Sequence, residues 1–163
     1  MARPKTVKKW RDWSTTFAPL ILWIGVIAFL STSYASMAET SRFIGPVLKY
    51  LFPNATEETL HAIHVVIRKL AHFTEYSLLA FFALRAIATP LNVRSHIRYV
   101  LPLILVIVIA SADEINQSFD AARTGLPSDA LLDIASGAIA IAIFWVMKWP
   151  RLSVGPERHS DDS

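Results

Sequence analysis

The sequence has no cysteine and few charged residues. Among its 163 residues the absence of cysteine excludes disulfides, thiol nucleophiles and cysteine-based zinc or iron–sulfur sites. Charged residues make up 18% of the chain, against roughly 25% in average soluble domains, whereas 53% of the residues are hydrophobic. The five glycines form no Walker or G-x-G-x-x-G motif. The composition therefore indicates one membrane-embedded domain.

The apolar runs predict an all-α fold, a bundle of four transmembrane helices. Phe17–Tyr34 is long enough to span a membrane alone, whereas Tyr99–Ala112 and Ile134–Met147 each cover only about 21 Å of a roughly 30 Å hydrocarbon core. The shorter runs must therefore draw polar neighbours into the membrane at one end. We predict a transmembrane domain over residues 1–150, with helices at about 15–36, 56–88, 97–117 and 129–148, and a polar cytoplasmic tail over 151–163.

The distribution of basic residues predicts that both termini are cytoplasmic. Eleven of the 16 Lys and Arg residues lie in or beside the N-terminal segment, the connection between the second and third helices, and the C-terminal end. Such an excess marks cytoplasmic segments. We therefore expect a multi-pass protein of the cell membrane with residues 39–59 and 113–130 outside. In the first outer loop, residues 43–52 are apolar but too short to span, so they form either an interfacial or a re-entrant segment.

Ionisable and polar residues gather at the predicted outer ends of three helices. A charge near the centre of a spanning helix costs about 2.5 to 3.5 kcal/mol, so these residues need partners and are candidates for function. We expect them to form one polar cluster. The candidate catalytic residues are His72, Glu75, Asp113 and Glu114, and the candidate substrate-binding residues are Lys69, Tyr76, Gln117, Arg123, Asp129 and Asp133.

This cluster is compatible with different functions. In an enzyme or binding protein, His72 with Glu75 or Asp113 forms an acid–base pair, while Lys69 with Arg123 holds a phosphate or carboxylate. In a non-catalytic scaffold, the same residues form an ion-pair network that orders the bundle or docks a partner. A proton-coupled carrier is less favoured, because the polar residues stop in the outer half of the membrane.

Metal and nucleic-acid sites find little support in the sequence. His61 and His64 lie one turn apart without a matched third ligand, and we interpret them, like Arg68, as interfacial polar residues. No metal and no other cofactor is expected. The basic residues form no exposed recognition surface, which argues against nucleic acid as a partner.

Three short motifs follow one another along the chain. They are KLAHFTEYSLL at residues 69–79, DEINQSF at 113–119 followed by Arg123, and DALLDIASGA at 129–138. Together they resemble the VanZ-like family of bacterial membrane proteins, whose patterns are K-x-x-H-F-x-E-Y-x-x-L, D-E-x-x-Q-x-F before an Arg, and D-x-x-x-(D/N) before small residues. Two departures are Ala121-Ala122, where the family has Pro-Gly, and Ser136, where glycine is expected.

The resemblance implies a fold and a location in the membrane, but it does not indicate a reaction. The name-giving member of the family is associated with resistance to the glycopeptide teicoplanin, and resistance in this chain does not follow from that. The partners expected for an enzyme or binding protein follow instead from the position of the polar cluster, where headgroups lie: membrane lipid and a lipid-linked or cell-wall precursor of the envelope.

Reporter fusions test the predicted topology. A reporter that is active only when exported should be active after Lys49 and after Gly125, since both positions lie in predicted outer loops. The same reporter fused after Arg94, in the predicted inner loop, should be inactive and serves as the matched control. Activity of a cytoplasmic reporter after Lys49 or Gly125 would contradict the topology.

Overall fold

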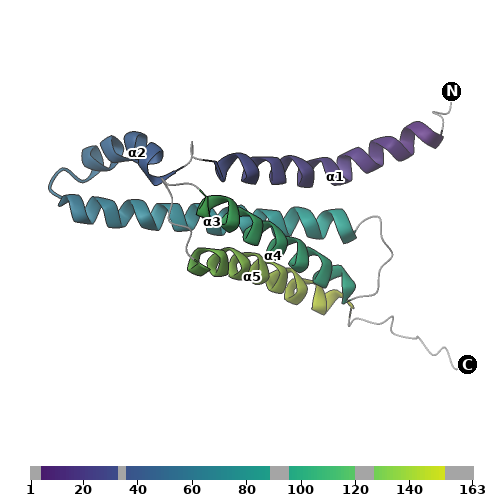
Figure 1. Ribbon diagram of the computed structural model, residues 1–163. Coiled ribbons are helices and arrows are strands. Elements are labelled where there is room, and N and C mark those ends of the chain that lie inside the picture. The colour runs from purple at the N-terminus through teal and green to yellow at the C-terminus, as the bar shows by residue number, and fades with distance from the viewer. Residues whose placement is uncertain (1–4, 33–35, 89–95, 120–126, 153–163) are drawn as a thin grey trace, which may run out of the picture.

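The computed structural model describes residues 5–32, 36–88, 96–119 and 127–152, and the regular secondary structure within them is entirely helical. The five helices are α1 (Lys5–Leu30), α2 (Met37–Leu51), α3 (Glu57–Ala88), α4 (Ile97–Ser118) and α5 (Pro127–Leu152) (Figure 1). The predicted all-α class is therefore confirmed. Most of the predicted tail, residues 153–163, lies outside the described residues.

The helix α2 is additional to the four predicted helices. It occupies the first loop, where the sequence predicted an interfacial or re-entrant segment. It begins after Ser36, whose hydroxyl oxygen accepts a hydrogen bond from the backbone N–H of Glu39 at 3.3 Å. The helix packs against α3 and buries Leu48, whereas Phe43 and Tyr50 are 77% and 86% exposed. One face of α2 is therefore packed on α3, while large apolar side chains remain on its exposed face.

The helix α1 ends at Leu30, before the predicted end near residue 36. The hydroxyl of Thr32 donates to the carbonyl of Phe29 at 2.6 Å and so satisfies one of the carbonyls left open at the helix end. Ser36 then starts the next helix. The uncharged run of the sequence is thus divided between α1 and the segment that leads into α2.

The longest helix, α3, packs against each of the other four helices (Figure 1). Ala80, Ala83 and Ala86 are fully buried on α3, and small residues such as these let helix backbones approach closely. Tyr76 and Leu79 on the same helix are also fully buried. The core of the bundle therefore lies along α3, and the buried candidate residues Glu75 and Tyr76 on this helix are positioned by that packing.

The helices α4 and α5 approach closely at Gly137. A Cβ atom at this position would lie 2.6 Å from Cγ1 and 3.3 Å from Cβ of Val106 on α4. Val106 is itself fully buried, so its side chain is enclosed by neighbouring atoms. Glycine at position 137 therefore allows the contact between the two helices.

Two helical segments, Ile97–Ser118 in α4 and Ser128–Met147 in α5, are long and apolar enough to cross a membrane. Only 22% and 28% of the residues in their apolar windows are buried, whereas the core helix of a soluble protein is mostly buried. Outward-facing residues include Ile104 and Leu131, which are 50% and 66% exposed. The exposed apolar faces are consistent with a membrane protein.

The start of α1 and the end of α5 lie at the same end of the bundle, while α2 covers the first turns of α3 at the opposite end (Figure 1). That opposite end also holds the end of α4 and the start of α5. The polar motifs of the sequence therefore meet at the end of the bundle where α2 lies.

The close approach at Gly137 predicts that one added methyl group lowers the stability of the protein. Gly137→Ala should destabilise the protein by about 1 to 3 kcal/mol, because the new Cβ overlaps Val106. Thermal unfolding in detergent measures the change. Gly25→Ala is the matched control: a Cβ there meets nothing within 4 Å, and alanine is favoured over glycine in a helix. If Val106→Ala did not restore stability to Gly137→Ala, the proposed overlap would be wrong.

Candidate functional site

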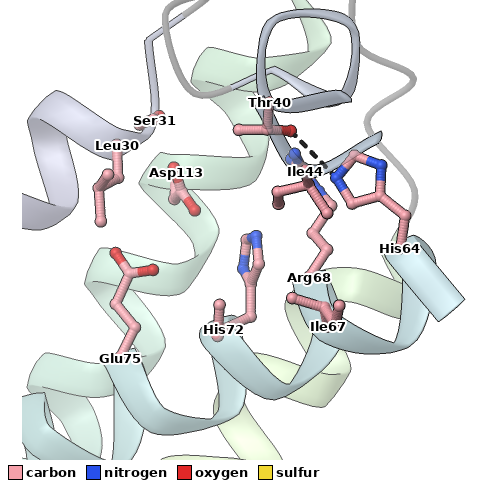
Figure 2. A pocket seen from close by; sticks show the side chains of 11 residues that line it. Leu30, Ser31, Thr40, Ile44, His64, Ile67, Arg68, His72, Glu75 and Asp113 are labelled. Atoms are coloured by element: carbon pink, nitrogen blue, oxygen red, sulfur yellow. Dashed lines mark hydrogen bonds between the residues drawn. The ribbon is translucent and has the colours of Figure 1, made fainter. Parts of the chain in front are cut away.

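A cavity of about 160 Å³ opens at the polar end of the bundle, between α1, α2, α3 and α4 (Figure 2). One part of its wall is apolar, and the remainder carries hydroxyl, basic and acidic groups. The lining residues are Leu30, Ser31, Thr40, Ile44, His64, Ile67, Arg68, Ala71, His72, Glu75 and Asp113. Three of the four candidate catalytic residues, His72, Glu75 and Asp113, thus face one space.

A histidine and an aspartate join α3 to α5 beside this cavity. Nδ1 of His72 lies 3.3 Å from Oδ1 and 3.4 Å from Oδ2 of Asp133. The Asp133 side chain is 4% exposed and the His72 side chain 19%, so the pair is largely removed from water. The carboxylate fixes the orientation of the imidazole ring, as a general acid or base requires.

A second connection joins α3 to α4 through Asp113. Its Oδ2 accepts hydrogen bonds from the hydroxyl of Tyr76 at 3.1 Å and from the side-chain amide of Gln117 at 2.9 Å. All three residues are buried. The other carboxylate oxygen, Oδ1, is buried without a hydrogen-bond partner in the structure. One oxygen of Asp113 is therefore held in place, and the other is left for an additional partner.

Two further carboxylates, those of Glu75 and Glu114, lie near the His72–Asp133 and Tyr76–Asp113 contacts. Glu75 is 9% exposed, and its backbone carbonyl accepts a hydrogen bond from the indole N–H of Trp23 on α1 at 2.9 Å. Figure 2 shows the Glu75 side chain on the α1 side of the cavity, near Leu30. Glu114 is half-buried, and its Oε1 is buried without a hydrogen bond. The site is thus rich in acidic groups.

The remaining predicted site residues lie at the edge of this cluster or outside it. Asp129 is half-buried, one turn before Asp133 on α5. Lys69 is exposed on α3 and does not line the cavity. Arg123 lies outside the described residues. Hydrogen bonds between side chains thus involve five of the ten candidates, which are His72, Tyr76, Asp113, Gln117 and Asp133.

The structure adds two basic side chains that the sequence analysis assigned to the interface. Arg68 is half-buried and lines the cavity, and so does the buried His64. Nε2 of His64 lies 3.3 Å from the hydroxyl oxygen of Thr40, which ties α3 to α2 (Figure 2). The spacing of four residues between His64, Arg68 and His72 places them on one helical face and is the sequence signal for this arrangement.

The fold and the site define a small all-α protein with exposed apolar helices and a polar cavity at one end. The model of the VanZ/LLP1 family matches residues 16–148, so the chain belongs to this family. The resemblance drawn from the three motifs is thereby confirmed. No curated protein and no solved structure matches the chain.

The hydrogen bond from Tyr76 to Asp113 predicts a loss of stability on its removal. Tyr76→Phe should cost about 1 to 3 kcal/mol, because a buried carboxylate oxygen loses a donor. Thermal unfolding of the purified protein in detergent measures the cost. Tyr50→Phe removes the same hydroxyl from a side chain that is 86% exposed and should leave stability unchanged. Equal unfolding temperatures for the two variants would show that the Tyr76 hydrogen bond contributes nothing.

Proposed function

We propose that the protein is a multi-pass protein of the cell membrane that binds the headgroup of a phosphate-bearing lipid in this cavity. The lipid is either a membrane phospholipid or a lipid-linked precursor of the cell envelope. In this proposal α1, α3, α4 and α5 cross the membrane as a four-helix bundle with both termini in the cytoplasm. The cavity then lies at the outer side, next to α2.

The orientation is supported by charge and by the position of the helix ends. The start of α1 and the end of α5 lie at one end of the bundle, where the sequence is rich in Lys and Arg (Figure 1). The cavity and the amphipathic α2 lie at the other end. With α2 in the interface, the exposed Phe43 and Tyr50 contact lipid while Arg42 stays at the level of the headgroups.

The observation that carries the proposal is the mixed lining of the cavity. Leu30, Ile44 and Ile67 offer apolar surface for the first part of a lipid tail, whereas Arg68 and His72 offer donors to a phosphate. A volume of about 160 Å³ is below the roughly 300 to 1,000 Å³ of sites for drug-sized ligands. The cavity therefore suits a headgroup, with the tails left in the membrane.

The histidine–carboxylate pair supports a chemical role at the same place. His72, held by Asp133, lines the cavity together with Glu75 and Asp113, and this is the arrangement of a base oriented by an acid. The alternative is a non-catalytic scaffold that orders the bundle or docks a partner. It is favoured by the fact that the same pair joins α3 to α5. A neutral substitution that conserves side-chain shape distinguishes the two: at a binding site it removes binding, whereas in a scaffold it lowers stability.

Lipid retention tests the proposal. Wild-type protein extracted in mild detergent should carry phosphate-bearing lipid in native mass spectrometry, and Arg68→Gln should reduce the occupancy at least fivefold, because the phosphate loses its charged donor. The mass of the retained lipid separates a phospholipid from a lipid-linked precursor, and lipid profiling of a deletion strain provides an independent comparison. Arg42→Gln is the matched control: its side chain is 73% exposed on α2, and occupancy should not change.

The scaffold alternative makes the opposite prediction for the same proteins. If Arg68→Gln retained lipid like the wild type but unfolded at a lower temperature, the residues of the cavity would serve stability alone. His72→Gln and Glu114→Gln extend the comparison, since each keeps the shape of the side chain while removing its ability to ionise. At a functional site both variants should accumulate in the membrane like the wild type yet fail to complement a deletion phenotype. Full complementation by both variants would favour the scaffold.

A further inference from the structure

We propose that His72, Asp113 and Asp133 form a binding site for one divalent metal ion at the base of the cavity. One ligand atom of each residue lies within 4.8 Å of the ligand atoms of the other two. The three residues come from α3, α4 and α5, so the ion would join the helices at the point where the cavity ends. Figure 2 shows the ring of His72 directed from α3 toward the side of the cavity where Asp113 lies.

The separations are close to those that a metal ion requires. Zinc binds histidine nitrogen and carboxylate oxygen at about 2.0 to 2.2 Å, so two ligands of one ion lie about 3 to 4 Å apart. His72 Nδ1 and Asp133 Oδ1, at 3.3 Å, already meet this condition. The longest of the three separations is at most 4.8 Å, so it must shorten by up to about 1 Å when the ion binds.

Both carboxylates present a buried oxygen that accepts no hydrogen bond. Oδ1 of Asp113 and Oδ1 of Asp133 are these oxygens, and the latter lies 3.3 Å from Nδ1 of His72, the third proposed ligand. The two aspartates are only 8% and 3% exposed. A buried carboxylate is costly unless a cation or a hydrogen-bond donor compensates it. An ion between these oxygens would compensate both aspartates at once, and Glu75 nearby adds further negative charge.

The surroundings of Asp113 resemble the outer shell of a metal site. Tyr76 and Gln117 both donate to Oδ2, which orients the carboxylate and directs Oδ1 away from them. Hydrogen bonds of this kind hold metal-binding carboxylates in position. The two donors belong to the family-like motifs of α3 and α4, so the same residues that match the family also orient the proposed ligand.

The ligand set indicates which ion fits. One imidazole nitrogen with two carboxylate oxygens suits Zn²⁺ or Mn²⁺, whereas Mg²⁺ and Ca²⁺ favour oxygen ligands throughout. Three protein ligands leave a coordination position open. Because His72 and Asp113 line the cavity, that position would face it and accept a phosphate oxygen of the headgroup. This role toward the headgroup rests on the proposed function, while the binding of the ion does not.

Metal analysis of the full-length protein tests the site. Protein purified in detergent is treated with a chelator, dialysed against Zn²⁺ or Mn²⁺ at low micromolar concentration, and analysed by mass spectrometry for metal. We expect about one ion per chain in the wild type and at least tenfold weaker binding in Asp133→Asn and His72→Gln. His64→Gln is the matched control, because the same substitution in a histidine of the same cavity should leave binding unchanged.

The unfolding temperature tests metal binding in variants that fold poorly. Added Zn²⁺ should raise the unfolding temperature of the wild type and of His64→Gln but not of Asp133→Asn, since an ion stabilises only a chain that binds it. Wild-type protein that holds no more metal than Asp133→Asn would overturn the site. So would an equal loss of metal in His64→Gln, because the ion would then lie elsewhere.

The outcomes separate the metal site from lipid binding. Retained lipid with no bound metal would contradict the metal site and leave the proposed function intact. Bound metal that depends on Asp133, in a protein that retains no lipid, would contradict the proposed function and leave the metal site intact. Arg68→Gln is expected to lower lipid occupancy without changing the metal content, because Arg68 is not a member of the ligand group.

Discussion

Buried carboxylates in an apolar bundle are the constraint on which the arrangement of the helices depends. Asp113 on α4 and Asp133 on α5 are both almost fully buried, and each is contacted by a residue of α3. A carboxylate in such surroundings is tolerated only with partners. Tyr76 and His72 supply these partners from successive turns of one helix. The rotation of α3 about its axis is thereby fixed relative to both neighbours.

The two ends of the bundle are packed differently. Toward the basic end, Ala80, Ala83 and Gly137 bring the helices close together, and Val106 fills the space that remains. Toward the polar end, a cavity opens between α1, α2, α3 and α4. The closely packed residues therefore support the site structurally, while the polar side chains of the site come from the other end.

The sequence predicted the helix class and the family, because each depends on local patterns. Apolar runs define helices, and motifs of 7 to 11 residues carry the family resemblance. It did not predict the break after Leu30, since Ser31 and Thr32 are neutral and do not interrupt an uncharged run. Nor did it predict that Arg68 faces the cavity, because that depends on α2 packing over α3. The proposed metal ligands have no common spacing, since each comes from a different helix.

For a bundle that spans a bilayer as proposed, the length of α3 has a consequence. Its 32 residues extend about 48 Å, which exceeds a hydrocarbon thickness of roughly 30 Å. In the proposed orientation, the part of α3 that carries His64 and Arg68 therefore lies where hydrocarbon gives way to headgroups. Thickening the bilayer would bring these side chains into hydrocarbon, and thinning it would expose them to water. Occupancy of the cavity would then depend on lipid chain length, which makes membrane thickness itself a determinant of ligand affinity.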